Sequence, residues 1–119
     1  MRDYYKWAKE FSDKYIKPVA EEIDEKGKFP KEIFDKIKEE GFFKVLVPTE
    51  YGGEGAGPEA QAFITQAFAE GAATVGLGYT MHNVALKFVL TFADEDFKKF
   101  IIKEVVENNK MLSLARSEF

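Results

Sequence analysis

The chain has 119 residues, the size of a single domain. Hydrophobic residues make up 45% of it and aromatic residues 15%, which indicates a globular protein with a core and excludes a disordered one. The 17 basic and 21 acidic side chains are interspersed, so no basic stripe points to nucleic acid. With no cysteine and one histidine, disulfides are excluded and a zinc site is not expected.

The sequence carries no sign of secretion or membrane insertion. Residues 1–6 are polar and charged, unlike a signal peptide. No apolar run approaches the ~18 residues that a membrane span needs. We therefore expect a cytoplasmic protein without a membrane partner.

Two helices are predicted in the first third of the chain. Apolar residues recur at spacings of three and four from Tyr4 to Ile23, the pattern of an amphipathic helix. Pro18 interrupts this pattern, so either the helix kinks there or two helices meet. A further helix is expected to begin at Pro30 and to end at Gly41 in a left-handed C-cap.

The middle of the chain predicts a connector, a loop and a helix. Residues 42–48 read as a buried connector rather than a strand, because Pro48 closes them so soon. Four of the eight residues in 51–58 are glycine, which indicates a loop. Pro58 marks the start of a helix whose predicted core face consists of Ala60, Phe63, Ile64, Ala67 and Phe68.

The last third predicts a central helix, a final helix and a strand. Thr74 is the expected N-cap of the central helix, and residues 75–92 are apolar on nearly every side, so neighbours or a partner chain should bury them. Asp94 should cap the final helix, whose predicted inner face is Phe97, Phe100, Ile101 and Val105.

Residues 111–117 alternate loosely and predict a strand without a partner in this chain. The expected fold is therefore all-α, an up-and-down-like bundle of five or six helices that ends in a short β-strand.

Six segments carry a family resemblance, in order along the chain. They are 15–24 with its internal proline, 29–42, the stretch Val-Pro-Thr-Glu-Tyr-Gly-Gly-Glu-Gly at 47–55, Met-His-Asn at 81–83, 92–99 and 114–118. Together they resemble the N-terminal helical domain of acyl-CoA dehydrogenases. The resemblance covers nearly the whole chain and implies one such domain over 1–119, in which 111–119 begin the β-domain that follows in the family.

The resemblance implies a flavoprotein reaction that this chain does not complete alone. In the family a glutamate of the C-terminal domain removes the α-proton of an acyl-CoA, and the β-hydrogen leaves as hydride to the FAD flavin, giving a trans-2-enoyl-CoA. This sequence contains neither that base nor most of the flavin domain. We therefore expect no catalytic residue here and no FAD retained by the chain alone.

The family alignment assigns two sets of binding residues. Leu77, Gly78 and Met81 match positions that face the acyl chain of the substrate, although the alternative is that all three are ordinary core. Leu114, Arg116 and Ser117 match positions beside the flavin. Arg116 would pair with a flavin or phosphate group or point to solvent, and Phe119 departs from the proline usual in the family.

Other residues that could carry chemistry have simpler explanations. His82 could titrate near neutral pH, but it lacks a visible relay partner, so a structural role is favoured. The carboxylates of Asp24, Glu54 and Glu70 lie near loops or helix ends, where solvated or capping roles are common. The glycine loop at 51–53 lacks the preceding strand and the Gly-Lys-Ser/Thr ending of a phosphate loop.

Three functions stay open at this point. The chain could belong to a flavoprotein dehydrogenase, as a truncated protein or as a subunit completed by another chain that carries the β and C-terminal domains. It could be a helical module that forms a homo-oligomer through the surface left exposed. It could also be a remnant without activity.

Overall fold

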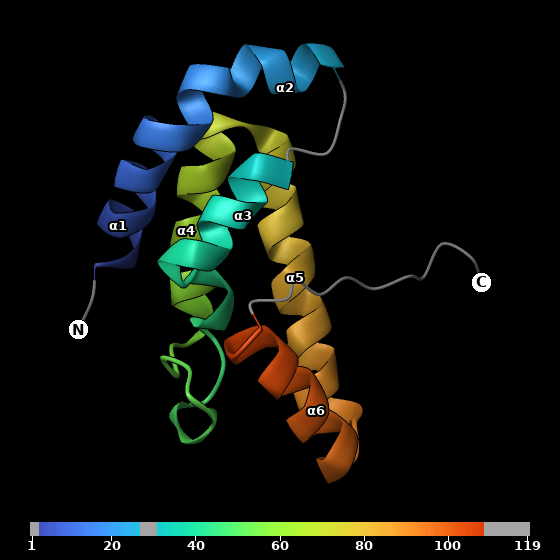
Figure 1. The fold of residues 1–119 in the computed structure, drawn as a ribbon. Helices are drawn as coiled ribbons and strands as arrows, with labels where there is room; N and C mark the ends of the chain where they lie inside the picture. Colours follow the sequence, from blue (N-terminus) through green and yellow to red (C-terminus); the bar gives the residue numbers. More distant parts are fainter. Residues whose placement is uncertain (1–2, 27–30, 109–119) are drawn as a thin grey trace.

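The computed structural model describes residues 3–26 and 31–108 (Figure 1). The described residues form six α-helices: α1 (Tyr4–Phe11), α2 (Ala20–Lys26), α3 (Lys31–Glu40), α4 (Pro58–Gly71), α5 (Ala73–Phe92) and α6 (Glu95–Val106). These ranges contain no β-strand, so the all-α prediction is confirmed. The strand predicted for 111–117 lies outside the described residues.

The first predicted helix changes direction around Pro18 without a break in helical structure. α1 continues into a π-helical turn, Ser12–Ile16, and a 3₁₀ turn, Lys17–Val19, before α2 begins. Because proline cannot donate the hydrogen bond of an α-helix interior, the chain adopts these altered turns around it. Figure 1 shows the result: α2 crosses the end of the molecule at a steep angle to α1.

The connector and the loop adopt the predicted conformations. Gly41 has φ +92°, the left-handed C-cap expected after α3. Val45 and Val47 are fully buried in an irregular segment, and their carbonyls accept hydrogen bonds from the Ala56 and Gly55 N–H groups at 3.0 and 2.8 Å. These bonds fold the glycine loop back onto the connector and so bring the start of α4 against it.

Aromatic packing joins the helices at the centre of the core. Phe42 stacks on Trp7 of α1 with ring centroids 3.7 Å apart and meets the Phe11 ring edge-on at 5.2 Å. Phe68 of α4 lies 5.0 Å from Phe42 and 5.3 Å from Tyr79 of α5. These pairs link α1, α4, α5 and the connector, and burial of such rings is the main source of stability in a chain of this size.

α4 and α5 form a tight antiparallel pair along the length of the molecule (Figure 1). α5 begins at Ala73, and its N-cap is Ala72, which has no capping side chain. The prediction of Thr74 as the N-cap was therefore wrong. Only one residue separates the two helices, so close packing of α4 on α5 sets where α5 begins. Gly76 permits that packing, because a Cβ there would lie 2.7 Å from the Ala69 Cβ.

Three phenylalanines predicted to face the core are instead exposed. Phe63 is 48% exposed, Phe97 51% and Phe100 56%. α6 buries Val105, as predicted, together with Ile102, which was not predicted, so its inner face is rotated from the predicted one. The prediction of Asp94 as its N-cap is confirmed, since the Asp94 carboxylate accepts a bond from the Phe97 N–H at 2.8 Å.

None of the helices in the described ranges combines the length and apolar character that crossing a membrane requires.

Candidate functional site

α5 presents an apolar stripe to solvent along most of its length. The stripe consists of exposed residues spaced four, three, four and four apart: Leu77, Met81, Val84, Phe88 and Phe92. We call these five residues the α5 apolar face. It exposes on the order of 500 Å² of apolar surface, if a fully exposed large side chain counts as ~200 Å². A patch of this size on a small domain indicates a surface that contacts a ligand or another polypeptide.

Two of the predicted substrate-binding residues belong to this face. Leu77 is 64% exposed and Met81 is 37% exposed, so neither is ordinary core within the described structure. Gly78 is partly exposed but turns toward α3, where a Cβ would collide with the buried Phe34 ring. The missing side chain of Gly78 therefore brings α3 and α5 together in this structure.

The opposite side of α5 is anchored to the connector by two buried polar side chains. The Tyr79 hydroxyl donates a hydrogen bond to the Phe42 carbonyl at 2.9 Å. One turn later the His82 Nε2 lies 2.9 Å from the Phe43 carbonyl. Since a carbonyl only accepts, Nε2 must carry the hydrogen. These bonds pair two buried backbone carbonyls and fix the rotation of α5, and therefore which of its residues face solvent.

Burial controls the protonation of both side chains. It lowers the pKa of His82 to about 4, against the opposing effect of the bond to Phe43, so the ring is neutral at pH 7. It also raises the pKa of Tyr79, which stays protonated. Neither group is poised to exchange protons near neutral pH.

Two of the carboxylates considered in the sequence accept hydrogen bonds from tyrosines of α1. Glu54 accepts one from the Tyr4 hydroxyl at 3.1 Å, and Glu70 accepts one from the Tyr5 hydroxyl at 2.7 Å. The Asp24 side chain lies outside the description. These contacts tie α1 to the loop and to α4.

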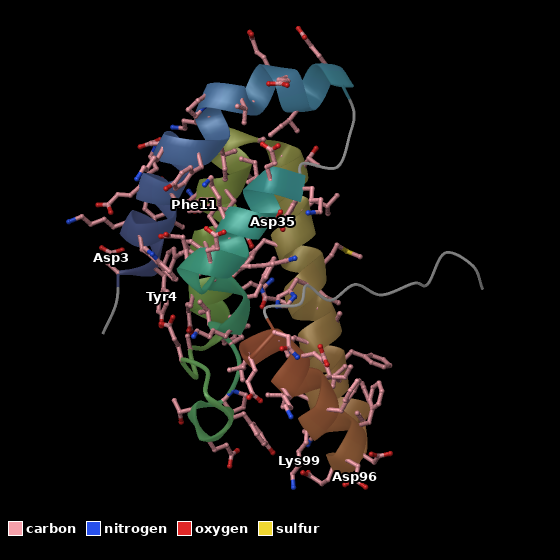
Figure 2. The ribbon with its side chains drawn as sticks, in the orientation of Figure 1. Asp3, Tyr4, Phe11, Asp35, Asp96 and Lys99 are labelled. Atoms are coloured by element: carbon pink, nitrogen blue, oxygen red, sulfur yellow. The ribbon has the colours of Figure 1, made fainter. Side chains whose placement is uncertain are left out.

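Sequence reasoning missed an open cleft of about 1040 Å³ beside the N-terminal end of α1. Its lining combines Tyr4, Phe63 and three acidic residues, Asp3, Glu54 and Glu59. Figure 2 shows Asp3 and Tyr4 at this end of α1, next to the glycine loop. The cleft draws its residues from two segments far apart in the sequence, 3–5 and 54–66, so no local motif could indicate it.

The described residues contain no cluster of three or more histidine, aspartate or glutamate side chains arranged for a metal ion. The predicted flavin-binding residues Leu114, Arg116 and Ser117 lie outside the described residues.

Comparison with known proteins gives a consistent family. The pattern of the acyl-CoA dehydrogenase N-terminal domain matches residues 2–109. A 3-(aryl)acrylate reductase of Clostridium sporogenes is 34% identical over 95% of this chain and 30% of its own length. A probable acyl-CoA dehydrogenase of Mycobacterium tuberculosis, FadE25, is 31% identical over 90% of this chain and 28% of its own length. The caffeyl-CoA reductase-Etf complex subunit CarC of Acetobacterium woodii is 29% identical over 95% of this chain and 30% of its own length.

The chain thus spans about a third or less of these relatives. The matched region coincides with the helices described above, from before α1 to the end of α6. On this evidence the chain belongs to the acyl-CoA dehydrogenase family, whose N-terminal domain it matches.

Proposed function

We propose that this chain forms the N-terminal wall of the acyl-chain pocket in an FAD-dependent enzyme that acts on the Cα–Cβ bond of acyl-CoA thioesters. The observation that carries the proposal is the α5 apolar face, which is exposed here and lies on the helix that carries the acyl-facing positions in the family. A saturated acyl chain has no polar group, so an apolar surface of this kind suits it. We propose that the catalytic base lies on polypeptide other than the described helices.

Within this face, Leu77 and Met81 are proposed to contact the acyl tail. The unbranched Met81 side chain adapts to irregular apolar partners, and Leu77 is the more exposed of the two. Gly78 lies between them and offers only backbone surface to the tail. Its contact with Phe34 holds α3 against this part of α5, so Gly78 also sets the position of its two neighbours.

The flavin of this enzyme is proposed to lie mainly against polypeptide other than the described helices. FAD supplies the hydride acceptor in this chemistry, and its pyrophosphate requires cationic or N–H donors. The helix that carries the α5 apolar face has one charged residue, Lys87. Leu114, Arg116 and Ser117 remain the proposed contacts of this chain to the flavin, and the chain alone is expected to release FAD on desalting.

The names of the relatives bear on the reaction direction and on partners. One is named as a probable acyl-CoA dehydrogenase and two as reductases of aryl acrylates or caffeyl-CoA. Desaturation of an acyl-CoA remains our proposal, and reduction of an enoyl-CoA is the same bond change in reverse. CarC is named as a subunit of a complex, which supports our proposal that this chain acts together with further polypeptide. We also propose that this assembly is cytoplasmic.

A chimera provides the test. Residues 2–109 of this chain would replace the matching part of the Clostridium sporogenes 3-(aryl)acrylate reductase, and flavin content and steady-state kinetics would be measured. We expect bound flavin, and we expect Leu77→Ala and Met81→Ala to raise KM or shift the preferred acyl length with flavin content unchanged. The exposed residue Lys99 provides the control, as Lys99→Gln. A flavin-loaded, active chimera whose substrate preference ignores both alanine variants would overturn the proposal.

The second candidate is a helical module that self-associates, and the same exposed face favours it. In the absence of covering polypeptide, the face would be buried against a second copy. Sedimentation of the isolated chain over a range of concentrations distinguishes the two functions, provided that the chimera experiment is done in parallel. If the isolated chain self-associates and the chimera is inactive, the module is favoured. If the chimera is active, the enzyme is favoured.

A further inference from the structure

Four exposed phenylalanines lie at the corner where α5 ends and α6 begins. Phe88 and Phe92 form one ring pair at the end of α5, with centroids 5.0 Å apart, and Phe97 and Phe100 form a second pair on α6, at 6.5 Å. Only residues 93 and 94 separate the two helices, which pack against each other. Each of the four side chains is more than half exposed. We call these four residues the phenylalanine corner.

The area of the phenylalanine corner suits a contact with another polypeptide. Its side chains together expose on the order of 450 Å², if a fully exposed phenylalanine counts as ~200 Å². A stable interface buries about 800 Å² on each partner, and its fully buried centre is its most apolar part. The corner therefore supplies an apolar centre of the size that a dimer needs, and the polar residues around it supply the rim.

The charged side chains of α6 indicate which partner fits this corner. Asp96 is in the first turn of the helix (Figure 2), and Lys103 lies two turns later on the same side, three residues after Phe100. Neither forms an ion pair among the described residues, whereas Glu95 and Lys98 pair with each other. A partner with an excess of either charge would meet one like charge here. A second copy of α6 that runs in the opposite direction meets Asp96 with its base and Lys103 with its acid.

We propose that the phenylalanine corner binds a second copy of this chain through an antiparallel α6–α6 contact with two-fold symmetry. The symmetry axis passes near Phe100, so the α6 ring pairs of the two copies meet at the centre, and the α5 pair extends the apolar area on each side. Asp96 precedes Phe100 by four residues and Lys103 follows it by three, so reversal of the helix exchanges their places. The surface is thus complementary to itself, as a two-fold contact requires.

This dimer contact goes beyond both proposed functions and is compatible with either. Leu77 and Met81 lie about 16 and 10 Å from Phe88 along α5, at ~1.5 Å per residue. They stay outside the contact, so the proposed acyl-chain wall remains free. Self-association through the α5 apolar face alone, by contrast, requires no residue of α6.

Charge-reversed variants of the full 119-residue chain test the geometry of the contact. Asp96→Lys carries bases at both positions and Lys103→Asp carries acids at both, so each variant alone should associate roughly tenfold more weakly than the unmodified chain at low salt. An equimolar mixture of the two variants should form a heterodimer, because every acid then meets a base across the contact. Sedimentation equilibrium measures the association of all samples, and circular dichroism checks that each variant is helical.

A pair of phenylalanine variants tests the apolar centre. Phe100→Lys should weaken association by about tenfold or more, because it places a charge at the centre of the contact. The matched control is Phe63→Lys, which changes a similarly exposed ring on α4, outside the corner, and should leave association nearly unchanged.

The proposal is wrong if the unmodified chain stays monomeric at every concentration, or if it forms open-ended assemblies instead of dimers. It is also wrong if both charge variants associate as strongly as the unmodified chain, or if their mixture associates no better than either variant alone. If Phe100→Lys does not fold, the charge variants still decide. None of these results bears on the chimera, which tests the acyl-chain wall separately.

Discussion

At the scale of single residues, His82 shows how burial turns a common titrating group into a structural one. Its folded pKa of about 4 lies below the ordinary 6.5, so between these values the unfolded chain binds a proton that the folded chain does not. The free energy of unfolding should therefore fall as pH drops from ~6.5 toward 4, by roughly 3 kcal/mol in total. Urea unfolding at pH 7 and pH 4.5 measures this loss.

The matched variant for this prediction is His82→Gln, which keeps an N–H donor for the Phe43 carbonyl but does not titrate. Its stability should change much less between the same two pH values. The carboxylates of Asp13 and Asp35 act in a lower range, because ion pairs with lysines lower the pKa of both below the ordinary 3.8. An equal loss of stability in both proteins would show that groups other than His82 cause it.

Gly78 provides a second test at this scale. Alanine is favoured over glycine by ~1 kcal/mol in a helix interior, but here a Cβ would collide with the buried Phe34 ring. Overpacking of this kind costs ~1–3 kcal/mol, so we expect Gly78→Ala to lower the free energy of unfolding by about 1 kcal/mol net. Chemical denaturation measures the change. In a Phe34→Leu background, which removes the colliding ring, the same substitution should be neutral or stabilising.

At the scale of elements, α5 and α6 begin by different means. α6 begins at a local signal, because the Asp94 carboxylate accepts a bond from the Phe97 N–H. Asp94→Ala should therefore reduce stability by ~1 kcal/mol, seen as a lower Tm, whereas Asp94→Asn keeps an acceptor and should cost less. Thr74, by contrast, is not a cap, so Thr74→Ala should leave the Tm nearly unchanged. A large loss in Thr74→Ala would contradict the α5 start seen here.

At the scale of the whole molecule, the α5 apolar face should determine whether the isolated chain self-associates. Phe88 is 52% exposed in the C-terminal half of this face and contacts Phe92, with ring centroids 5.0 Å apart. Phe88→Lys should weaken self-association, seen as a lower weight-average mass in sedimentation equilibrium, without loss of helical circular dichroism. The control is Lys87→Glu, which alters charge beside the face and leaves its apolar area intact. Unchanged association of Phe88→Lys would show that another surface makes the contact.

Local rules were sufficient for the elements whose physics is local. Spacings of three and four predicted the helices, Gly41 predicted a left-handed cap, and Pro48 predicted a connector instead of a strand. The candidate site was harder to predict from the sequence, because a helix that is apolar on nearly every side does not show which side other helices cover. The bonds of Tyr79 and His82 to the connector made that choice for α5.

The sequence by itself determined the helical class, most helix ends and the family, because caps, turns and periodicity depend on neighbours within a few residues. Only the tertiary structure decided that Leu77 and Met81 are exposed and that Phe97 and Phe100 are not core. These facts depend on how far each helix is rotated against its partners. That rotation is set by close contacts between helices, such as Gly78 with Phe34 and Gly76 with Ala69. A local sequence pattern cannot predict such contacts, because each of them joins residues of two different helices.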